Sequence, residues 1–265
     1  MRWTVGDASP RGFEALRLSI WGAWRVFGPA ADYVVCVNRI TPEEARARTG
    51  PVPPAIAWRP PGELPATVRG LLDERMAEGV AWKFASLRLF PGRNELALDN
   101  DCVLWAMPEA LRTWPRSDTE DLCVIAEDVR PGFGQFADLC GPEPRNSGIR
   151  GLPPGFDLGA ALAHVLARRP ARLDSELDEQ GLQVAAVSQQ RSPLVVRLDE
   201  VTVCSPFHPH LAELGRCGAH FVGLNLRHIP WSYYQRPADE WQAEHCSRHR
   251  PALYRAVGLE PPPSG

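Results

Sequence analysis

An apolar run that contains two carboxylates, residues 95–105, constrains this chain more than any other stretch. The apolar residues on either side have the composition of buried strands, and Asp99-Asn100-Asp101 lies between them at a predicted strand end or turn. In extended chain, side chains two residues apart point the same way. Asp99 and Asp101 can therefore hold a divalent cation that keeps other positions for water and phosphate oxygens. The alternative is a turn capped by the pair, because Asp and Asn are common turn residues.

The chain before this run alternates apolar strands with helices. The predicted strands cover residues 2–5, 33–38 and 55–58, and the predicted helices cover residues 12–27, 66–76 and 80–89. Continuous apolar strands are typical of parallel sheets, which are buried on both faces. Asp7 and Asn38 follow two of these strands, and open α/β sheets bind ligands at the carboxyl ends of their strands. We therefore expect Asp7, Asn38 and Asp99 at one edge of a mainly parallel sheet.

After Pro108 the predicted elements become shorter and more mixed. They are a strand at residues 122–125, glycine-rich loops at 130–134 and 146–151, helices at 157–169 and 177–187, and strands at 194–198 and 201–204. Such loops usually serve a site or an irregular sheet edge. Asp178, near the start of the second of these helices, is expected to cap it.

Length and charge exclude several classes of protein. The 265 residues suffice for one α/β domain, which we divide into a nucleotide-binding half (1–105), a sugar and acceptor half (106–258) and a tail (259–265). The net charge is −3 and the 29 Lys and Arg residues are scattered, so nucleic acid is not an expected partner. No apolar run reaches the roughly 18 residues of a membrane helix, and the N-terminus does not resemble a signal peptide. We therefore expect no membrane span and a cytoplasmic location.

Cysteine and histidine usage leaves a second kind of metal site open. Seven cysteines, an odd number without regular spacing, indicate reduced thiols. Six of the seven histidines lie between residues 208 and 249. Four or more ligands for a structural zinc ion could come from His245, Cys246, His249, His208 and His210. Their spacing matches no regular finger pattern, and ordinary loop and helix residues are the alternative.

Several short motifs together resemble those of a known family of enzymes. In chain order they are Lys83-x4-Arg88, Leu98-Asp99-Asn100-Asp101, Asn146-Ser147-Gly148, Asp178-Glu179-Gln180-Gly181-Leu182, and His220-Phe221-Val222-Gly223 followed by Pro230-Trp231. The order resembles that of the GT-A nucleotide-sugar glycosyltransferases, most of all the retaining family of glycogenin and the bacterial galactosyltransferases (glycosyltransferase family 8). The resemblance implies a GT-A type α/β fold, with a mainly parallel central sheet and flanking helices.

The resemblance also implies a metal centre. In that family an Asp-x-Asp pair and a later histidine hold manganese on the donor diphosphate, and the matching residues here are Asp99, Asp101 and His220. This set of two oxygens and one nitrogen suits Mn²⁺ better than Mg²⁺. In the family a lysine before Pro-Trp contacts the diphosphate, whereas this chain has His228 and Ile229 before Pro230. Arg227 or His228 could replace it, or the segment could be a structural loop.

Donor contacts are implied at further positions. Asp7 and Asn38 are expected at the base or ribose, and Lys83 at a phosphate or the sugar. Glu179 is expected to bind sugar hydroxyls, with Gln180 under the anomeric carbon. The remaining expected donor-binding residues are Asn100, Asn146 and Gly223.

The predicted function is metal-dependent transfer of a sugar from a nucleotide-diphospho-sugar, with UDP-sugars favoured, to an unknown acceptor. Because Gln180 is a poor nucleophile, we expect retention through front-face attack by the acceptor. The alternatives are a non-catalytic sugar-nucleotide binder of the same fold and a protein with a structural zinc site. Among the aromatic residues that follow His220, Trp241 is expected to pack in the fold, and Tyr233 or Tyr234 to face the acceptor.

Overall fold

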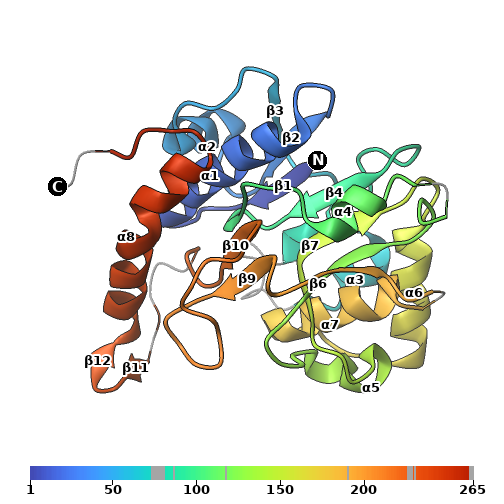
Figure 1. Ribbon diagram of the computed structural model, residues 1–265. Helices are drawn as coiled ribbons and strands as arrows, with labels where there is room; N and C mark the ends of the chain where they lie inside the picture. Colours follow the sequence, from blue (N-terminus) through green and yellow to red (C-terminus); the bar gives the residue numbers. More distant parts are fainter. Residues whose placement is uncertain are drawn as a thin grey trace.

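A mixed sheet forms the centre of the computed structural model, which describes residues 1–72, 81–85, 87–116, 118–189, 191–225, 229 and 231–262 (Figure 1). In these ranges its strands are β1 Arg2–Val5, β2 Tyr33–Val37, β3 Ile56–Arg59, β4 Glu95–Leu98, β6 Val124–Glu127, β7 Arg145–Leu152 and β8 Leu194–Val196. Their order is β3-β2-β1-β4-β7-β6-β8. The first four run parallel, whereas β7 is antiparallel to both of its neighbours.

A smaller sheet joins distant parts of the chain. It contains β5 Cys102–Leu104, β10 Gly218–Phe221 and β9 Val201–Cys204, in that order. β10 is antiparallel to β5, with His220 opposite Cys102, and parallel to β9. The short strands β11 Ser232–Tyr233 and β12 Arg236–Pro237 form a separate hairpin.

Four of the described helices begin at a side chain that caps them. The described helices are α1 Pro10–Phe27, α2 Pro42–Thr49, α3 Ala66–Arg69, α4 Glu109–Thr113, α5 Ala137–Cys140, α6 Leu158–Arg168, α7 Glu176–Val187 and α8 Ala238–Ala256, with 3₁₀ turns η2 Ala81–Phe84 and η3 Gly134–Phe136. Ser9, Thr41 and Asp157 each accept a hydrogen bond from the first turn of the helix that follows. Ser175 caps α7, and Asp178 closes a capping box with it. The predicted capping residue of α7 was therefore wrong by three positions.

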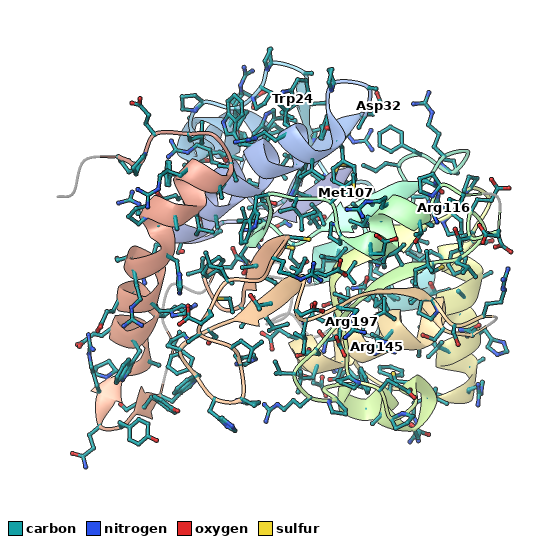
Figure 2. The ribbon with its side chains drawn as sticks, viewed as in Figure 1. Trp24, Asp32, Met107, Arg116, Arg145 and Arg197 are labelled. Atoms are coloured by element: carbon teal, nitrogen blue, oxygen red, sulfur yellow. The ribbon has the colours of Figure 1, made fainter. Side chains whose placement is uncertain are left out.

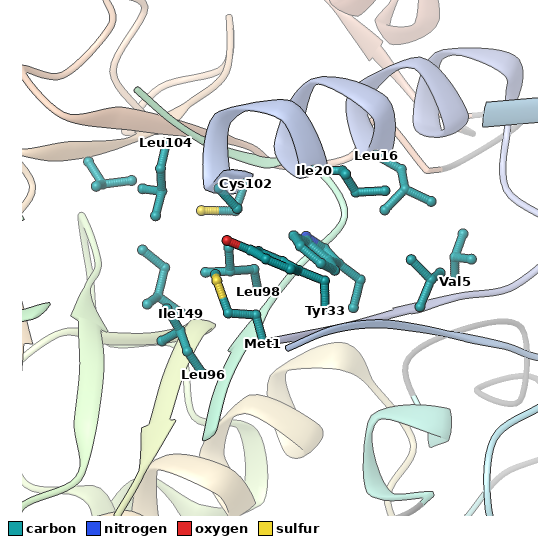
Figure 3. Close-up of a cluster of buried hydrophobic side chains, with 14 of the residues drawn as sticks. Met1, Val5, Leu16, Ile20, Tyr33, Leu96, Leu98, Cys102, Leu104 and Ile149 are labelled. Atoms are coloured by element: carbon teal, nitrogen blue, oxygen red, sulfur yellow. The ribbon is translucent and has the colours of Figure 1, made fainter. Parts of the chain in front are cut away.

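Apolar side chains fill both sides of the central sheet. Figure 3 shows the cluster between α1 and the sheet, where Leu16 and Ile20 of the helix lie above Val5, Tyr33 and Leu98. A second cluster lies under α6 and α7, and a third joins α1 and α8 to the small sheet.

Aromatic contacts fix the position of α1 on the sheet. The ring centroid of Trp24, labelled in Figure 2, lies 5.3 Å from that of Tyr33, and Trp3 stacks on the same Tyr33 ring at 6.3 Å. The indole nitrogen of Trp3 donates to Ser19 of α1 at 2.8 Å. These contacts hold α1 against β1 and β2.

Two sequence-based predictions about local structure are wrong. Residues 146–151 form the middle of β7 instead of a loop, and their glycines leave room for His220 and Trp114, which an added Cβ at Gly148 or Gly151 would meet. The helix predicted over 80–89 stops at Phe84 as the turn η2. At the far end of the predicted range, the backbone N–H groups of residues 89 and 90 donate to the buried carboxylate of Glu95, so they are not available for helical hydrogen bonds.

The remaining predicted elements are present with small shifts in their ends, whereas α2, α4, α5, β10 and α8 were not predicted. The helix predicted over 66–76 is described only as α3, which ends at Arg69, and residues 73–80 lie outside the described ranges. The division of the chain at residue 105 stays a prediction. In the described part of the chain, no helix combines the length and the apolar character needed to cross a membrane.

Candidate functional site

Two carboxylates and an imidazole meet where the central sheet joins the small sheet. Asp99 and Asp101 follow β4, and His220 lies on β10. The Nε2 atom of His220 is 3.3 Å from Oδ1 of Asp101 and 3.6 Å from Oδ2 of Asp99. One ligand atom from each residue lies within 4.8 Å of the other two. The structure therefore brings together the three residues predicted as metal ligands.

Backbone hydrogen bonds hold this group in place. The amide of Cys102 donates to the carbonyl of Asp99 at 3.0 Å, which closes the turn, and the amide of Phe221 donates to the carbonyl of Asp101 at 2.9 Å. The amide of Asp99 donates to the carbonyl of Gly148 at 2.8 Å. Strands β5, β7 and β10 thus all contribute to the position of the carboxylates.

The donor atoms of this group fit a divalent cation. Oδ1 of Asp101 is buried and has no well-aligned hydrogen bond within the described residues, although it faces the His220 imidazole. Burial opposes protonation of His220, but contact with Asp101 and the charge of Asp99 outweigh it and raise the imidazole pKa. Excess negative charge is thus concentrated at this point. Asp99, Asp101 and His220 would hold the ion.

Lys83 partly neutralises this charge. Its Nζ atom lies 2.9 Å from both carboxylate oxygens of Asp99 and 3.6 Å from Oε2 of Glu179. Burial alone would raise the pKa of Asp99, but Lys83 and His220 outweigh it and lower that pKa. Lys83 reaches the site from η2, as predicted from the sequence, although its element is a short turn.

A buried acid and a buried base lie behind Lys83. Burial raises the pKa of Glu179 to about 7, and burial lowers the pKa of Arg150 to about 10. Oε1 of Glu179 and the Nε and Nη1 atoms of Arg150 have no hydrogen-bond partner among the described residues. Arg150 and Lys83 line a cavity of about 20 Å³ that also touches Asp99 and Gln183. Such a space holds one water molecule or the end of a polar ligand.

Hydrogen-bonded polar side chains connect α7 to β7 through Asp128. Nε2 of Gln180 donates to the carbonyl of Gly132 at 2.8 Å and lies 3.5 Å from Oδ2 of Asp128. The same Asp128 oxygen accepts a hydrogen bond from Asn146 at 3.1 Å, and Oδ1 of Asn146 accepts one from the Gly148 amide at 2.7 Å. Gln180 and Asn146, both predicted at the donor sugar, are therefore linked to the strand that supports Asp99.

The predicted nucleotide side of the site lies at the same sheet edge. Asp7, Asn38 and Asp99 follow the carboxyl ends of β1, β2 and β4, which are parallel, so the prediction of a common edge is confirmed. Both amide atoms of buried Asn38 have no hydrogen-bond partner in the described part of the chain. Asp7 is exposed and its carboxylate accepts a 2.6 Å hydrogen bond from Arg48. Asn38 thus offers an unused donor and acceptor, and Asp7 an exposed carboxylate.

Asn100 lies on the other side of the turn from its neighbours' carboxylates. Its Nδ2 donates to Oδ1 of Asn225 at 2.5 Å and to the Gly12 carbonyl at 3.2 Å, and Asn225 donates back to Oδ1 of Asn100 at 2.9 Å. Asn225 also approaches Oδ2 of Asp101 at 3.4 Å. These bonds support a positioning role for Asn100 more than the predicted donor contact. Asn225 was not predicted from the sequence, because it lies 125 residues from Asn100 and only the folded chain brings the two together.

Other predicted residues are only partly described. Gly223 follows β10 with a φ of +88°, a conformation that favours glycine. Arg227, His228 and Pro230 lie outside the described residues. Trp241 packs as expected, with its indole donating to the Tyr233 carbonyl at 2.9 Å, whereas Tyr234 is 81% exposed.

The predicted zinc ligand set is not assembled. Exposed His208 and the Cys246 thiol do not belong to the group of potential ligands around His245 and His249, which instead includes Cys204. The reason is helical geometry, since Cys246 projects from a different side of α8 than residues 245 and 249.

Solved structures decide the fold. A complex of the galactosyltransferase LgtC with donor and acceptor sugar analogues superposes over 100% of this chain and 98% of its own, with a TM-score of 0.53 and 12% identity. The chain has the GT-A fold. An active-site mutant of LgtC matches 97% of this chain and 100% of its own (TM-score 0.52, 12% identity). Mouse xyloside xylosyltransferase 1 matches 86% of this chain and 98% of its own (TM-score 0.50, 13% identity). No family model and no curated protein matches the sequence.

The GT-A fold accounts for the mixed character of the sheet. Parallel strands bring Asp7, Asn38 and Asp99 to one edge, and antiparallel β7 begins at that edge with Asn146. Strand β10 then adds His220 from the second half of the chain. At this low identity the similarity establishes the fold, and the chemistry of the site has to be argued from its own residues.

Proposed function

We propose that this protein is a metal-dependent glycosyltransferase that moves a sugar from a nucleotide-diphospho-sugar to an acceptor. The observation that carries the proposal is the convergence of Asp99, Asp101 and His220 at the carboxyl edge of a GT-A sheet. Mn²⁺, or Mg²⁺, held there would neutralise charge on the departing diphosphate as a Lewis acid. Without a cation the two carboxylates would repel that diphosphate.

Asn38 and Asp7 are proposed to bind the nucleoside. The buried Asn38 amide can both donate to and accept from a pyrimidine edge, and its unpaired state in the described structure supports this use. The Asp7 carboxylate is suited to ribose hydroxyls, with Arg48 holding it in place. Uracil offers an adjacent carbonyl and N–H to this amide, as thymine and guanine also do, and among these donors we propose UDP-sugars.

Glu179, Gln180 and Lys83 are proposed to bind the sugar and its phosphate. Glu179 has an unsatisfied buried oxygen, which suits a sugar hydroxyl, and Lys83 between Asp99 and Glu179 can reach a phosphate. The hydrogen bond from Nε2 of Gln180 to Gly132 leaves its amide oxygen for the anomeric carbon. An amide oxygen is a weak nucleophile, so we propose retention with the acceptor attacking from the leaving-group side.

Calorimetry with a panel of UDP-, GDP- and dTDP-sugars tests the proposal. Protein freed of metal with EDTA should bind no donor detectably, and added Mn²⁺ should restore binding of one nucleotide class, with UDP expected. Asp101→Asn, which removes the charge of one proposed metal ligand at nearly constant shape, should lose the Mn²⁺-dependent binding. Equal affinity with and without EDTA would overturn the metal-dependent proposal. Release of UDP from a bound donor over time would distinguish an enzyme from a binding protein.

Lys83→Met is expected to tighten Mn²⁺ binding in the absence of donor by about tenfold, equivalent to roughly 1.4 kcal/mol. The ammonium group now competes for both oxygens of Asp99, and methionine keeps the length of the side chain without its charge. Donor affinity in the presence of saturating Mn²⁺ should fall, because a phosphate partner is lost. Titration of Mn²⁺ by electron paramagnetic resonance measures the first effect. Weaker Mn²⁺ binding would show that Lys83 organises the carboxylates instead of competing for them.

A further inference from the structure

A second group of potential metal ligands lies in the core beneath α8. It consists of Cys204 at the end of β9 and of His245 and His249 on α8, and all three side chains are buried. One ligand atom from each lies within 4.8 Å of the other two. None of these residues takes part in the proposed glycosyl transfer. We call these three residues the Cys204 cluster.

Helical spacing and strand register bring the three side chains together. Residues four apart lie on one face of a helix, so His245 and His249 are neighbours along α8, with ring centroids 4.7 Å apart and the rings edge to face. The parallel register of β9 and β10 places Cys204 beside Phe221, whose ring lies 6.1 Å from each imidazole. The face of α8 that bears the histidines therefore covers the end of β9. In Figure 1, α8 runs alongside this small sheet.

The polar atoms of the cluster make two contacts that are compatible with a metal site. Sγ of Cys204 lies 3.3 Å from Nε2 of His245. Nε2 of His249 lies 2.8 Å from the carbonyl of Ala212, a contact in which the nitrogen must donate, which leaves the lone pair of Nδ1 unused. Metal-binding histidines commonly donate their second ring nitrogen to a backbone carbonyl in this way, because the contact fixes the tautomer and the ring orientation.

The ligand types select the ion. One thiolate and two imidazoles form a soft to borderline set, which favours Zn²⁺ and contrasts with the oxygen-rich group at Asp99 and Asp101. We propose that the Cys204 cluster binds a zinc ion that joins α8 to β9. Binding replaces the Cys204 thiol proton, which passes to solvent, with a sulfur–zinc bond.

This site lies apart from the proposed donor site. Successive residues of a strand face opposite sides, so His220 points to Asp99 and Asp101 while Phe221 points to the Cys204 cluster. A zinc ion at the cluster would fix β9 and β10 under α8 and so support the strand that carries His220. Because the two groups share no ligand, each metal proposal can fail without the other.

Cobalt substitution tests the proposal in the full chain. Metal-free protein carrying Asp99→Asn and Asp101→Asn, which lacks the carboxylate site, should bind one equivalent of Co²⁺ with a thiolate-to-cobalt absorption band in the near ultraviolet. Zn²⁺ should displace the Co²⁺ and abolish the band. Cys204→Ser should lose the band, whereas Cys246→Ser, which removes the adjacent thiol on α8, should keep it. The proposal would be overturned if the protein carrying Asp99→Asn and Asp101→Asn showed no band, or if only the added Cys246→Ser substitution abolished the band.

A stability measurement covers the case in which Cys204→Ser fails to fold. The protein carrying Asp99→Asn and Asp101→Asn, stripped of metal, should gain melting temperature on addition of Zn²⁺ and lose it again with chelator, and adding His249→Gln should reduce that gain. Adding Mn²⁺ alone should not reproduce the gain. A melting temperature that does not respond to Zn²⁺ would identify the cluster as packed side chains with a thiol-to-imidazole hydrogen bond.

Discussion

Replacing His220 by alanine is expected to weaken Mn²⁺-dependent donor binding by at least about a hundredfold. Loss of an outer-shell partner of a ligand already costs about 10–100-fold in metal affinity, and His220 supplies one of the three proposed ligand atoms. Its buried imidazole faces the carboxylates of Asp99 and Asp101. We therefore expect the metal-free variant to lose less than about 2 kcal/mol of unfolding free energy.

Calorimetric titration of donor with and without Mn²⁺ measures this effect, and chemical denaturation measures stability. His208→Ala is the matched control, because His208 is an exposed histidine in the same part of the chain. If His220 is only a packed side chain beside Phe221, its replacement should lower the melting temperature and leave the response to Mn²⁺ unchanged. That result would remove His220 from the proposed metal centre.

Gly148→Ala is expected to displace His220 and to weaken Mn²⁺ binding by about tenfold or more, an effect of the size seen when a ligand loses its orientation. A Cβ at this position would lie 2.4 Å from Cε1 of His220, 2.6 Å from its Nδ1, and 2.8 Å from Oδ1 of Asn146. The backbone of Gly148 cannot easily withdraw, because its carbonyl accepts from Asp99 and its amide donates to Asn146. Overpacking of this kind costs about 1–3 kcal/mol of stability.

A double-mutant cycle isolates the contact. If the clash with the imidazole causes the loss, Gly148→Ala should cost less stability in a His220→Ala background than alone, because the obstructing ring is gone. Gly92→Ala is the control, since an added Cβ there meets nothing within 4 Å. Additive effects of the two substitutions would mean that the loss arises in β7 itself.

The parallel half of the fold is predictable from the sequence, because its strands are continuous apolar runs and polar residues follow them directly. Tyr33–Val37 is buried throughout, and Asn38 comes next at the sheet edge. The spacing of Asp99 and Asp101 also identified the carboxylate pair without help from the fold. Periodicity and polarity carry this information, so local reasoning is sufficient.

The second half depends on contacts that local patterns do not encode. Two of the eight residues of β7 are glycine and four are polar, which is a loop-like composition, yet Gly148 and Gly151 accommodate the side chains of His220 and Trp114. Arg150 in the same strand was overlooked, although an arginine between Ile149 and Gly151 in a central strand has to be buried. The role of His220 came from the family resemblance, because its strand looks like ordinary core.

The pairing of β5 with β10 has a consequence for the order in which the site forms. Cys102 and His220 are opposite each other in that pair, so the metal ligands come together only after the chain beyond residue 220 has been made and the intervening loop has closed. During synthesis the N-terminal strands can assemble first, with Asp99 and Asp101 already present but unpartnered. A nascent or truncated chain that ends before β10 would thus carry Asp99 and Asp101 without His220, and the proposed metal centre would be complete only once β10 has paired with β5.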